Sequence, residues 1–348
     1  MARLRLLCLT VLMLCVSTRI AAADDRTLRV LAWPGYADSD LVALFEKRYK
    51  AKVEVTLVSS DEVLRSKMAE HQGGDFDVIA ANTAEIHYYV NQSLLQPVQP
   101  ERIPNTARQV AGFRDYARIP DIAIGGKVYA IPYVWSDMGL IYDRRQFKQP
   151  PDSISSMWDP ALRGKVLAFN TSNHNFSLAS LALGGDPFHI RAADFPAVTD
   201  KLIALRRNVL TFYMLPEETA ELFRTHAVAL IFANYGRQQL KQLREAGADV
   251  GYVIPREGAL AWLDCWAISR GARNVSLAEQ WINYTLEPQV SGALSQRQAL
   301  STTVGGASAE DIASANLIWL QPVEDDARRA ALWQRIISGE RPPLKEAP

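Results

Sequence analysis

Cysteine is scarce in this sequence of 348 residues, which contains only Cys8, Cys15 and Cys265. The first two lie in an N-terminal stretch with the features of an export signal, so Cys265 would be alone in the processed chain. A single cysteine cannot form an intrachain disulfide, and the fold therefore depends on its hydrophobic core. With 48% apolar residues that core is ample, and the chain length favours two domains over one.

Long hydrophobic runs are also missing, because no later segment reaches the roughly 18 uninterrupted apolar residues expected of a membrane span. The one marked run, residues 6–16, is too short to cross a bilayer. It follows Arg3 and Arg5 and precedes three alanines that end at Ala23, which is the order of regions in a secretory signal. We therefore predict a signal peptide over residues 1–23 and an exported protein.

An excess of charge of either sign is absent too. The chain has 38 basic and 38 acidic side chains, and loss of Arg3, Arg5 and Arg19 with the signal leaves 35 against 38, a net charge of about −3. Because no basic run occurs either, the sequence offers no electrostatic surface for nucleic acid.

Catalytic and phosphate-binding motifs are lacking: there is no glycine-rich phosphate loop, no Gly-x-Ser-x-Gly and no His-Glu-x-x-His. Cys265 lies in an apolar strand pattern and is interpreted as a buried, inert thiol. The histidines lack metal-ligand spacing and are interpreted as surface or loop residues: His71, His87, His174, His189 and His226. These absences favour a binding protein without cofactor or metal, and leave an enzyme as a minor alternative.

What the sequence does contain is the pattern of an α/β protein, in which short apolar runs alternate with amphipathic, helix-length segments. Polar Asn82 and Thr83 follow closely after the third predicted strand, at the end where ligands bind in open α/β sheets. A second α/β series runs from residue 165 to about residue 255. Strands are predicted over residues 28–32, 53–58, 76–80, 134–142 and 260–269, and helices over residues 40–49, 60–70 and 277–286.

Two large aromatic residues, Trp33 and Tyr36, stand on either side of Pro34-Gly35 in the turn after the first predicted strand. A tight turn requires glycine or proline and not two rings. From this stretch alone, rings that cap the core and rings that line a binding cleft are equally good interpretations.

Six segments, taken in order, resemble the periplasmic spermidine/putrescine-binding proteins of bacterial ABC importers, within the larger group of extracellular solute-binding proteins. The resemblance covers nearly the whole processed chain. It implies two α/β lobes joined by crossing hinge strands, with one lobe at residues 27–135 plus 262–303 and the other at residues 136–261 plus 304–348. The segments are LAWPGY, GGDFDVIAANT, GGKVYAIPYVWSDMGLIYD, SMWDPALRGKV, GALAWLDCWAIS and AEQWINYTLEPQV.

The resemblance also implies the function and part of the site. It implies a periplasmic protein that closes on a small linear amine and presents it to an ABC permease in the inner membrane. In such proteins aromatic rings stack on the alkyl chain and ammonium of the ligand, the role implied for Trp33, Tyr36 and Trp262. Asp264 stands where the family has a carboxylate for a terminal ammonium. Asn82 and Thr83 match hydroxyl positions of the family, and Phe232 stands where it has a tryptophan.

The sequence departs from the family where acids usually follow the Gly-Lys-Val strand. It has the neutral residues 170–174 there, of which Thr171 is a candidate hydrogen-bond partner of the ligand. Asp137 is an acid where small or hydroxyl residues are common and can replace part of what is lost, with Glu85 as a further acid at the rim. Leu300 occupies the position of a late cleft tyrosine.

An unpaired buried ammonium costs several kcal/mol, so the missing acids favour a ligand with one cationic end over spermidine. An ω-amino acid such as 4-aminobutyrate or 5-aminovalerate fits, with Arg237 or Arg207 as a candidate partner of its carboxylate. A polyamine such as putrescine or spermidine stays the alternative ligand. A binding protein that signals through a membrane sensor stays the alternative function.

Overall fold

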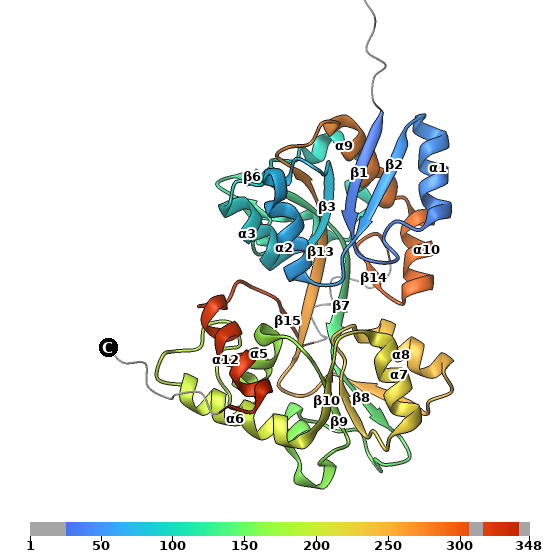
Figure 1. Cartoon of the computed structure of the whole chain (residues 1–348). Helices are drawn as coiled ribbons and strands as arrows, with labels where there is room; N and C mark the ends of the chain where they lie inside the picture. The colour runs from blue at the N-terminus through green and yellow to red at the C-terminus, as the bar shows by residue number, and fades with distance from the viewer. Residues whose placement is uncertain (1–25, 306–315, 341–348) are drawn as a thin grey trace, which may run out of the picture.

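The computed structural model describes residues 26–305 and 316–340, which form two α/β lobes joined by strands that pass from one lobe into the other (Figure 1). The predicted signal peptide, residues 1–23, lies outside the described residues. Of the described helices, none combines the length and apolar character that crossing a membrane requires.

The first lobe is built on a mixed sheet with the order β14-β7-β13-β3-β1-β2. Strand β1 is parallel to both β2 and β3, and β13 is antiparallel to β3 and β7. β4 and β15 also pair with β13. The strands are β1 (Thr27–Ala32), β2 (Lys52–Leu57), β3 (Val78–Asn82), β4 (Leu95–Gln96), β7 (Ala130–Met138), β13 (Ala259–Ser269), β14 (Ser301–Thr302) and β15 (Leu317–Trp319).

Helices cover both faces of this sheet because neighbouring strand residues point to opposite sides. Val30 belongs to the core beneath α1, α9 and α10, whereas Leu31 belongs to the core beneath α2 and α3. The helix α2 begins after Ser60, whose side chain accepts a hydrogen bond from the Val63 N–H. The helices are α1 (Ser39–Tyr49), α2 (Asp61–Ala69), α3 (Thr83–Asn91), α9 (Val275–Thr285) and α10 (Pro288–Gln298), with the short α4 (Ala111–Arg114) and the hairpin β5 (Ala123–Ile124) and β6 (Lys127–Val128) at the edge.

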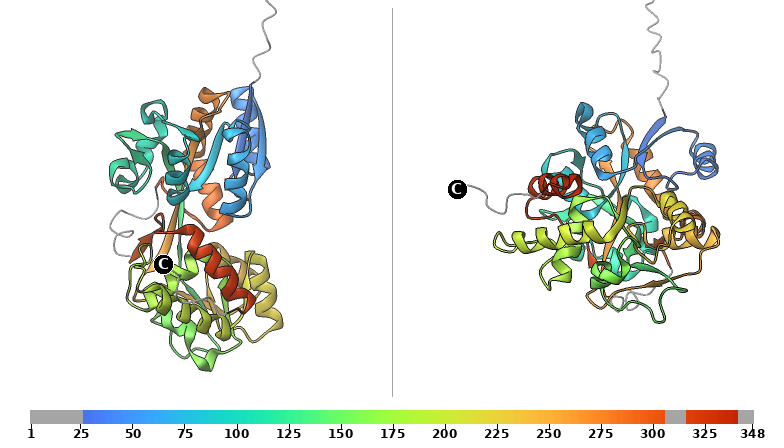
Figure 2. Two further views of the ribbon diagram at one scale, coloured as in Figure 1. Left: turned by 60° about the vertical axis from the view of Figure 1, so that its left-hand side comes forward. Right: turned by 60° about the horizontal axis from the view of Figure 1, so that its bottom comes forward.

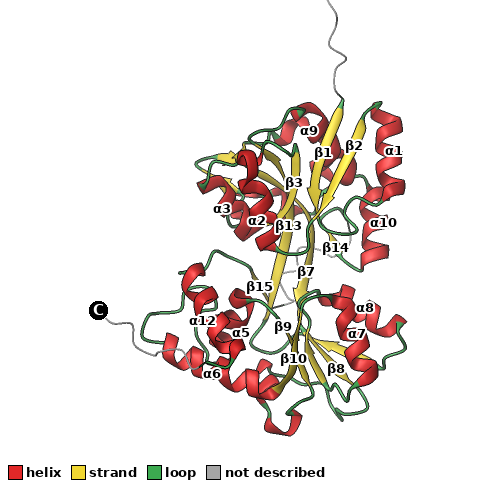
Figure 3. Ribbon diagram, viewed as in Figure 1, coloured by secondary structure: helices red, strands yellow, loops and turns green. Residues whose placement is uncertain are grey.

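The second lobe has a smaller sheet with the order β10-β9-β11-β8-β12. Helices α5, α6 and α12 lie on one side of it and α7 and α8 on the other (Figure 3). The strands are β8 (Leu140–Asp143), β9 (Val166–Phe169), β10 (Val209–Tyr213), β11 (Leu230–Phe232) and β12 (Val250–Val253), and the helices are α5 (Ser172–Ala182), α6 (Phe195–Asn208), α7 (Pro216–Thr225), α8 (Gly236–Glu245) and α12 (Asp326–Ser338).

The long strands β7 and β13 connect the lobes. β7 ends at Met138, and after Gly139 the chain continues as β8 in the other sheet. The single strand predicted over residues 134–142 is therefore wrong in detail, because the chain changes sheets at Gly139. A Cβ at this position would lie 2.6 Å from the carbonyl oxygen of Val253, so the crossing has room only for glycine. The lobe boundaries predicted from the resemblance fall within or beside these strands and stay a prediction.

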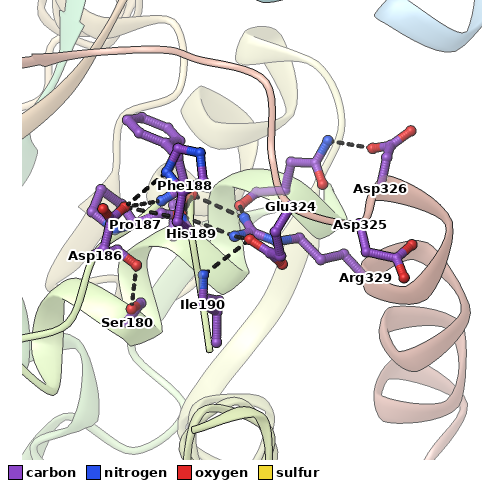
Figure 4. A network of polar contacts seen from close by, with 12 residues as sticks. Ser180, Asp186, Pro187, Phe188, His189, Ile190, Glu324, Asp325, Asp326 and Arg329 are labelled. Atoms are coloured by element: carbon purple, nitrogen blue, oxygen red, sulfur yellow. Dashed lines mark hydrogen bonds and ion pairs between the residues drawn. The ribbon is translucent and has the colours of Figure 1, made fainter. Parts of the chain in front are cut away.

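The helix α12, near the C-terminal end, is fixed to the second lobe by the hydrogen bonds that a buried ion pair makes to residues of that lobe (Figure 4). The side chain of Arg329 is fully buried and donates to both carboxylate oxygens of Glu324, at 2.8 and 2.6 Å, and to the carbonyl oxygen of Pro187 at 3.0 Å. Glu324 in turn accepts a hydrogen bond from the Ile190 N–H. Figure 2 shows the helix lying along this lobe from the side. The first turn of α12, which includes Asp326, therefore lies on the side of the second lobe that is nearest to the first lobe.

Candidate ligand-binding site between the lobes

A cavity of about 220 Å³ lies between the lobes. The first lobe contributes the turn after β1, the ends of β2 and β3, and strand β13, and the second lobe contributes the starts of α5, α7 and α8. The residues at its wall are Trp33, Pro34, Tyr36, Val58, Ser59, Asp61, Asn82, Trp262, Asp264 and Leu300 from the first lobe, His174, Leu215, Pro216, Glu217, Asn234, Tyr235 and Gln238 from the second, and Met138 and Leu320 from the crossing segments.

The structure brings together the predicted site residues from the two ends of the sequence. Trp33, Tyr36, Trp262 and Asp264 all line this cavity, and so does Asn82. The prediction that the first four meet in one cleft is confirmed, although 228 residues separate Tyr36 from Asp264. Their contact with a ligand stays a prediction.

Tyr36 joins the core to the cavity wall. Its ring is buried, packs edge-on against Tyr133 with 5.7 Å between ring centroids, and is also close to Trp266. Its hydroxyl donates a hydrogen bond of 2.6 Å to Asp264 Oδ2. Both interpretations of the two rings therefore hold, since Tyr36 caps the core and also orients the acid, while half-buried Trp33 faces the cavity.

Burial raises the pKa of the Asp264 carboxyl to about 7, and the hydrogen bond from Tyr36 offsets part of that rise. Near neutral pH the empty site therefore holds a mixture of protonated and ionised carboxyl groups. A cation placed against the carboxyl would favour the ionised form, because opposite charges at close range lower the pKa of an acid.

Asp61, at the start of α2, is a cavity acid that the sequence analysis did not identify. Asn82 lies directly opposite Asp264 in the register of β3 with β13, and its side-chain amide donates to Asp61 Oδ1 at 3.2 Å. The other end of that amide caps α3 by accepting the Glu85 N–H. Because β1, β2 and β3 are parallel, the residues after all three strands meet at one edge, and that rule could have identified Asp61 after β2.

The second lobe contributes a neutral histidine. His174 Nδ1 lies 2.7 Å from Asn234 Oδ1, and because that oxygen can only accept, Nδ1 carries the hydrogen and Nε2 is left as an acceptor. Burial lowers the pKa of His174, so the ring is uncharged at neutral pH. The interpretation of His174 as a surface or loop residue is wrong, because it is half-buried at the cavity wall.

Other predicted site residues do not line this cavity. Thr83 is buried and donates its hydroxyl hydrogen to the carbonyl oxygen of Leu320. Thr171 precedes α5, and its carbonyl oxygen accepts a hydrogen bond from the Asn175 side chain. Phe232 is buried in the core of the second lobe. Contact of these three residues with a ligand stays a prediction.

Asp137 also lies away from the cavity wall, at the crossing between the lobes. The Tyr252 hydroxyl contacts its carboxylate and also its carbonyl oxygen, the latter at 2.9 Å. Arg237 lies 3.5 Å from the same carboxylate. From the sequence, Asp137 was a candidate partner of the ligand ammonium and Arg237 a candidate partner of a ligand carboxylate. In the structure the two side chains pair with each other.

The charge at the cavity wall has one sign. Asp61 and Asp264 lie inside, and Glu217 is exposed at the rim on the second lobe. Among the described residues that line it there is no arginine or lysine. Aromatic faces combined with carboxylates suit an ammonium group and its alkyl chain, since the cation is attracted both to the rings and to the acids.

Two α/β lobes that are joined by crossing strands and enclose such a cavity are the architecture of a solute-binding protein. The chain belongs to the bacterial extracellular solute-binding proteins, whose family model matches residues 40–317. The family and the two-lobe fold expected from the sequence are thereby confirmed.

Sequence relatives agree with this assignment, and solved structures agree with the fold. The putrescine-binding periplasmic protein PotF of Escherichia coli K12 is 27% identical over 292 residues, which are 80% of this chain and 78% of that protein. Spermidine/putrescine-binding periplasmic protein 1 of Haemophilus influenzae is 25% identical over 76% of this chain and 72% of its own. A putative spermidine/putrescine ABC transporter structure from Listeria monocytogenes has a TM-score of 0.75 and 24% identity, over 90% of this chain and 98% of that one. The structure of the binding protein MotA of A. tumefaciens B6 with glucopine has a TM-score of 0.68 and 15% identity, over 89% and 99%.

Proposed function

We propose that the protein is the periplasmic substrate-binding component of an ABC importer for a small linear amine. The observation that carries the proposal is the cavity between the lobes, which Trp33, Trp262, Asp61 and Asp264 line together. The ligand ammonium lies against Asp264, which Tyr36 orients, and the alkyl chain lies along the two indole rings. The similarity to the putrescine-binding protein PotF supports the same ligand class.

The charges of the cavity wall favour an amine without a carboxylate over an ω-amino acid. A buried carboxylate requires a cation or several hydrogen-bond donors, and the described lining residues include no arginine or lysine. Arg237 is directed to Asp137, and Arg207 is exposed on α6. The preference for an ω-amino acid depended on the number of acids expected at the ligand. That number omitted Asp61 and Glu217, which line the cavity, so the preference is no longer supported.

Thermal unfolding in the presence of single compounds tests the proposal. Putrescine, spermidine, butylamine, 4-aminobutyrate and 5-aminovalerate are each added to the purified protein. A ligand at 100 times its Kd adds about 2.7 kcal/mol to the free energy of unfolding. We expect the amines to raise the unfolding temperature more than the amino acids do. If no amine raises it, the proposed function is wrong.

Transport is tested separately in the bacterium. Deletion of the gene should reduce uptake of the labelled amine, and the gene for a permease should be required for the same uptake. If uptake is unchanged but a transcriptional response to the amine is lost, the protein serves a membrane sensor instead.

A further inference from the structure

We infer that Asp61 is a second carboxylate for ligand charge, so that the site selects amines with two cationic groups over amines with one. This inference rests on the proposed function and specifies its ligand class.

The position of Asp61 gives the first support. It lines the same cavity as Asp264, and the two acids lie on either side of Asn82, which pairs in register with Asp264 and donates to Asp61. Residues opposite each other on antiparallel strands have their side chains on one face of the sheet. The two carboxyl groups are thus neighbours on one wall, and each raises the cost of ionising the other.

The absence of a committed counter-ion gives the second support. The one hydrogen bond that Asp61 makes to a described residue comes from the neutral amide of Asn82. The nearby cation Arg65 is used elsewhere, because its Nε and Nη2 donate to Glu85 at 2.8 and 2.6 Å and its Nη1 donates to Asp326 at 2.7 Å. Burial, followed by the charges of Glu85 and Asp264, raises the pKa of Asp61 well above its usual value.

Among the described residues, the charges around this wall do not balance. Asp61, Glu85, Asp264 and Asp326 contribute four carboxylates, and Arg65 pairs with Glu85 and Asp326. Arg329 also lies near Asp326, but it is paired with Glu324. His174, across the cavity, is neutral at pH 7. One ligand ammonium on Asp264 would leave Asp61 as an ionised group without a cation or as a protonated acid. A second cationic group removes that cost, because a buried carboxylate is stable when it is paired.

Isothermal titration with putrescine and butylamine tests the inference, because the two ligands have the same carbon chain and differ by one ammonium. Asp61→Asn keeps the shape of the side chain and removes its charge. We expect the variant to bind putrescine at least about 30-fold more weakly, as when a buried charge pair loses one partner. Butylamine affinity should stay within about threefold. Glu62→Gln is the matched control, because it removes an acid from the neighbouring, exposed position of the same helix, and it should change neither affinity.

Every outcome of this titration is informative. If the wild-type protein binds neither amine, the proposed function itself fails. If it binds putrescine and Asp61→Asn binds it equally well, the proposed function stands and the inference is overturned. If the variant loses both ligands to the same extent, the two carboxylates share one ammonium, and the assignment of a second cationic group is wrong. Asp61→Ser and a circular dichroism spectrum of each variant separate loss of charge from loss of fold.

Discussion

At the scale of single residues, Tyr36 and Asp264 show how a core position becomes a functional one. The Tyr36 ring packs against Tyr133 and Trp266, and this packing holds the hydroxyl at 2.6 Å from the Asp264 carboxylate. An acid with such a fixed donor cannot turn away from the cavity. The result is a preoriented carboxylate whose protonation is sensitive to pH near neutrality.

The first prediction concerns this sensitivity. Burial raises the pKa of Asp264 to about 7, and a cationic ligand binds the ionised form, so a proton competes with the ligand below that value. Butylamine affinity should rise about tenfold between pH 6 and pH 8 and then level off until the amine itself loses its proton near pH 10. Titration calorimetry across this range measures the effect. Asp264→Asn should bind weakly at every pH, and equal wild-type affinity at pH 6 and pH 8 would contradict the prediction.

Individual site residues differ in how far the sequence predicts them. Trp33, Tyr36, Trp262 and Asp264 stand in short segments that resemble a known family, so their position could be predicted without a structure. Asp137 was assigned to the ligand because the sequence does not show that Tyr252 and Arg237 pack against it. Asp61 was missed for the opposite reason, since an acid at the start of a helix is usually explained by the helix alone.

At the scale of helices and strands, an ion pair of Arg65 with Asp326 joins the lobes beside the cavity. Arg65 in α2 donates to Asp326 in the first turn of α12, which also accepts from Asn173. The hydrogen bonds of Arg329 to Pro187 and of Ile190 to Glu324 fix α12 to the second lobe, so the Arg65–Asp326 contact depends on the lobes being close together.

The second prediction follows from this contact. Both side chains are partly exposed, and such ion pairs contribute about 0.2–1 kcal/mol. Asp326→Asn should therefore weaken amine binding by less than about fivefold, and the change should appear as a faster dissociation rate, because the closed form is the one that loses a contact. Stopped-flow fluorescence measures that rate. Glu221→Gln, which breaks an exposed ion pair with Arg224 inside one lobe, should leave it unchanged.

The third prediction concerns Gly139, where the chain passes from β7 into β8. A methyl group there would lie 2.6 Å from the Val253 carbonyl oxygen and 2.8 Å from the Tyr252 ring. Gly139→Ala should lower the free energy of unfolding by about 1–3 kcal/mol, the usual cost of overpacking. Gly292→Ala is the control, because a Cβ in this position of α10 meets no atom within 4 Å and alanine favours helix by about 1 kcal/mol. Denaturant unfolding should give changes of opposite sign, and equal stability of the two variants would refute the explanation.

The elements were predicted more accurately than their connections. The predicted strand at residues 260–269 and the helix at residues 277–286 lie within a residue or two of β13 and α9, because hydrophobic spacing reports on local structure. The single strand at residues 134–142 failed at Gly139 because a change of sheet depends on packing against distant residues such as Val253.

At the scale of the whole molecule, composition and length predicted only that two domains were likelier than one. The arrangement of two lobes with crossing strands came from the resemblance of six segments in order. Periodicity could not supply it, because each lobe contains strands from distant parts of the sequence: β13 lies between β7 and β3 in the first sheet.

This central position of β13 has a consequence for the order in which the protein acquires its structure during synthesis. The strands of the second sheet all lie between Leu140 and Val253, so each has been synthesised before Ala259. The first sheet, in contrast, has a gap between β3 and β7 until β13 has been synthesised, although β1, β2 and β3 come first from the ribosome. Pulse-labelled hydrogen exchange during refolding should therefore show amides of β1 and β3 becoming protected together with those of β13. Early protection of β1 and β3 alone would be the contrary result. If the expected result is found, β1, β2 and β3 remain without stable structure, and accessible to proteases, until about three quarters of the protein has been translated.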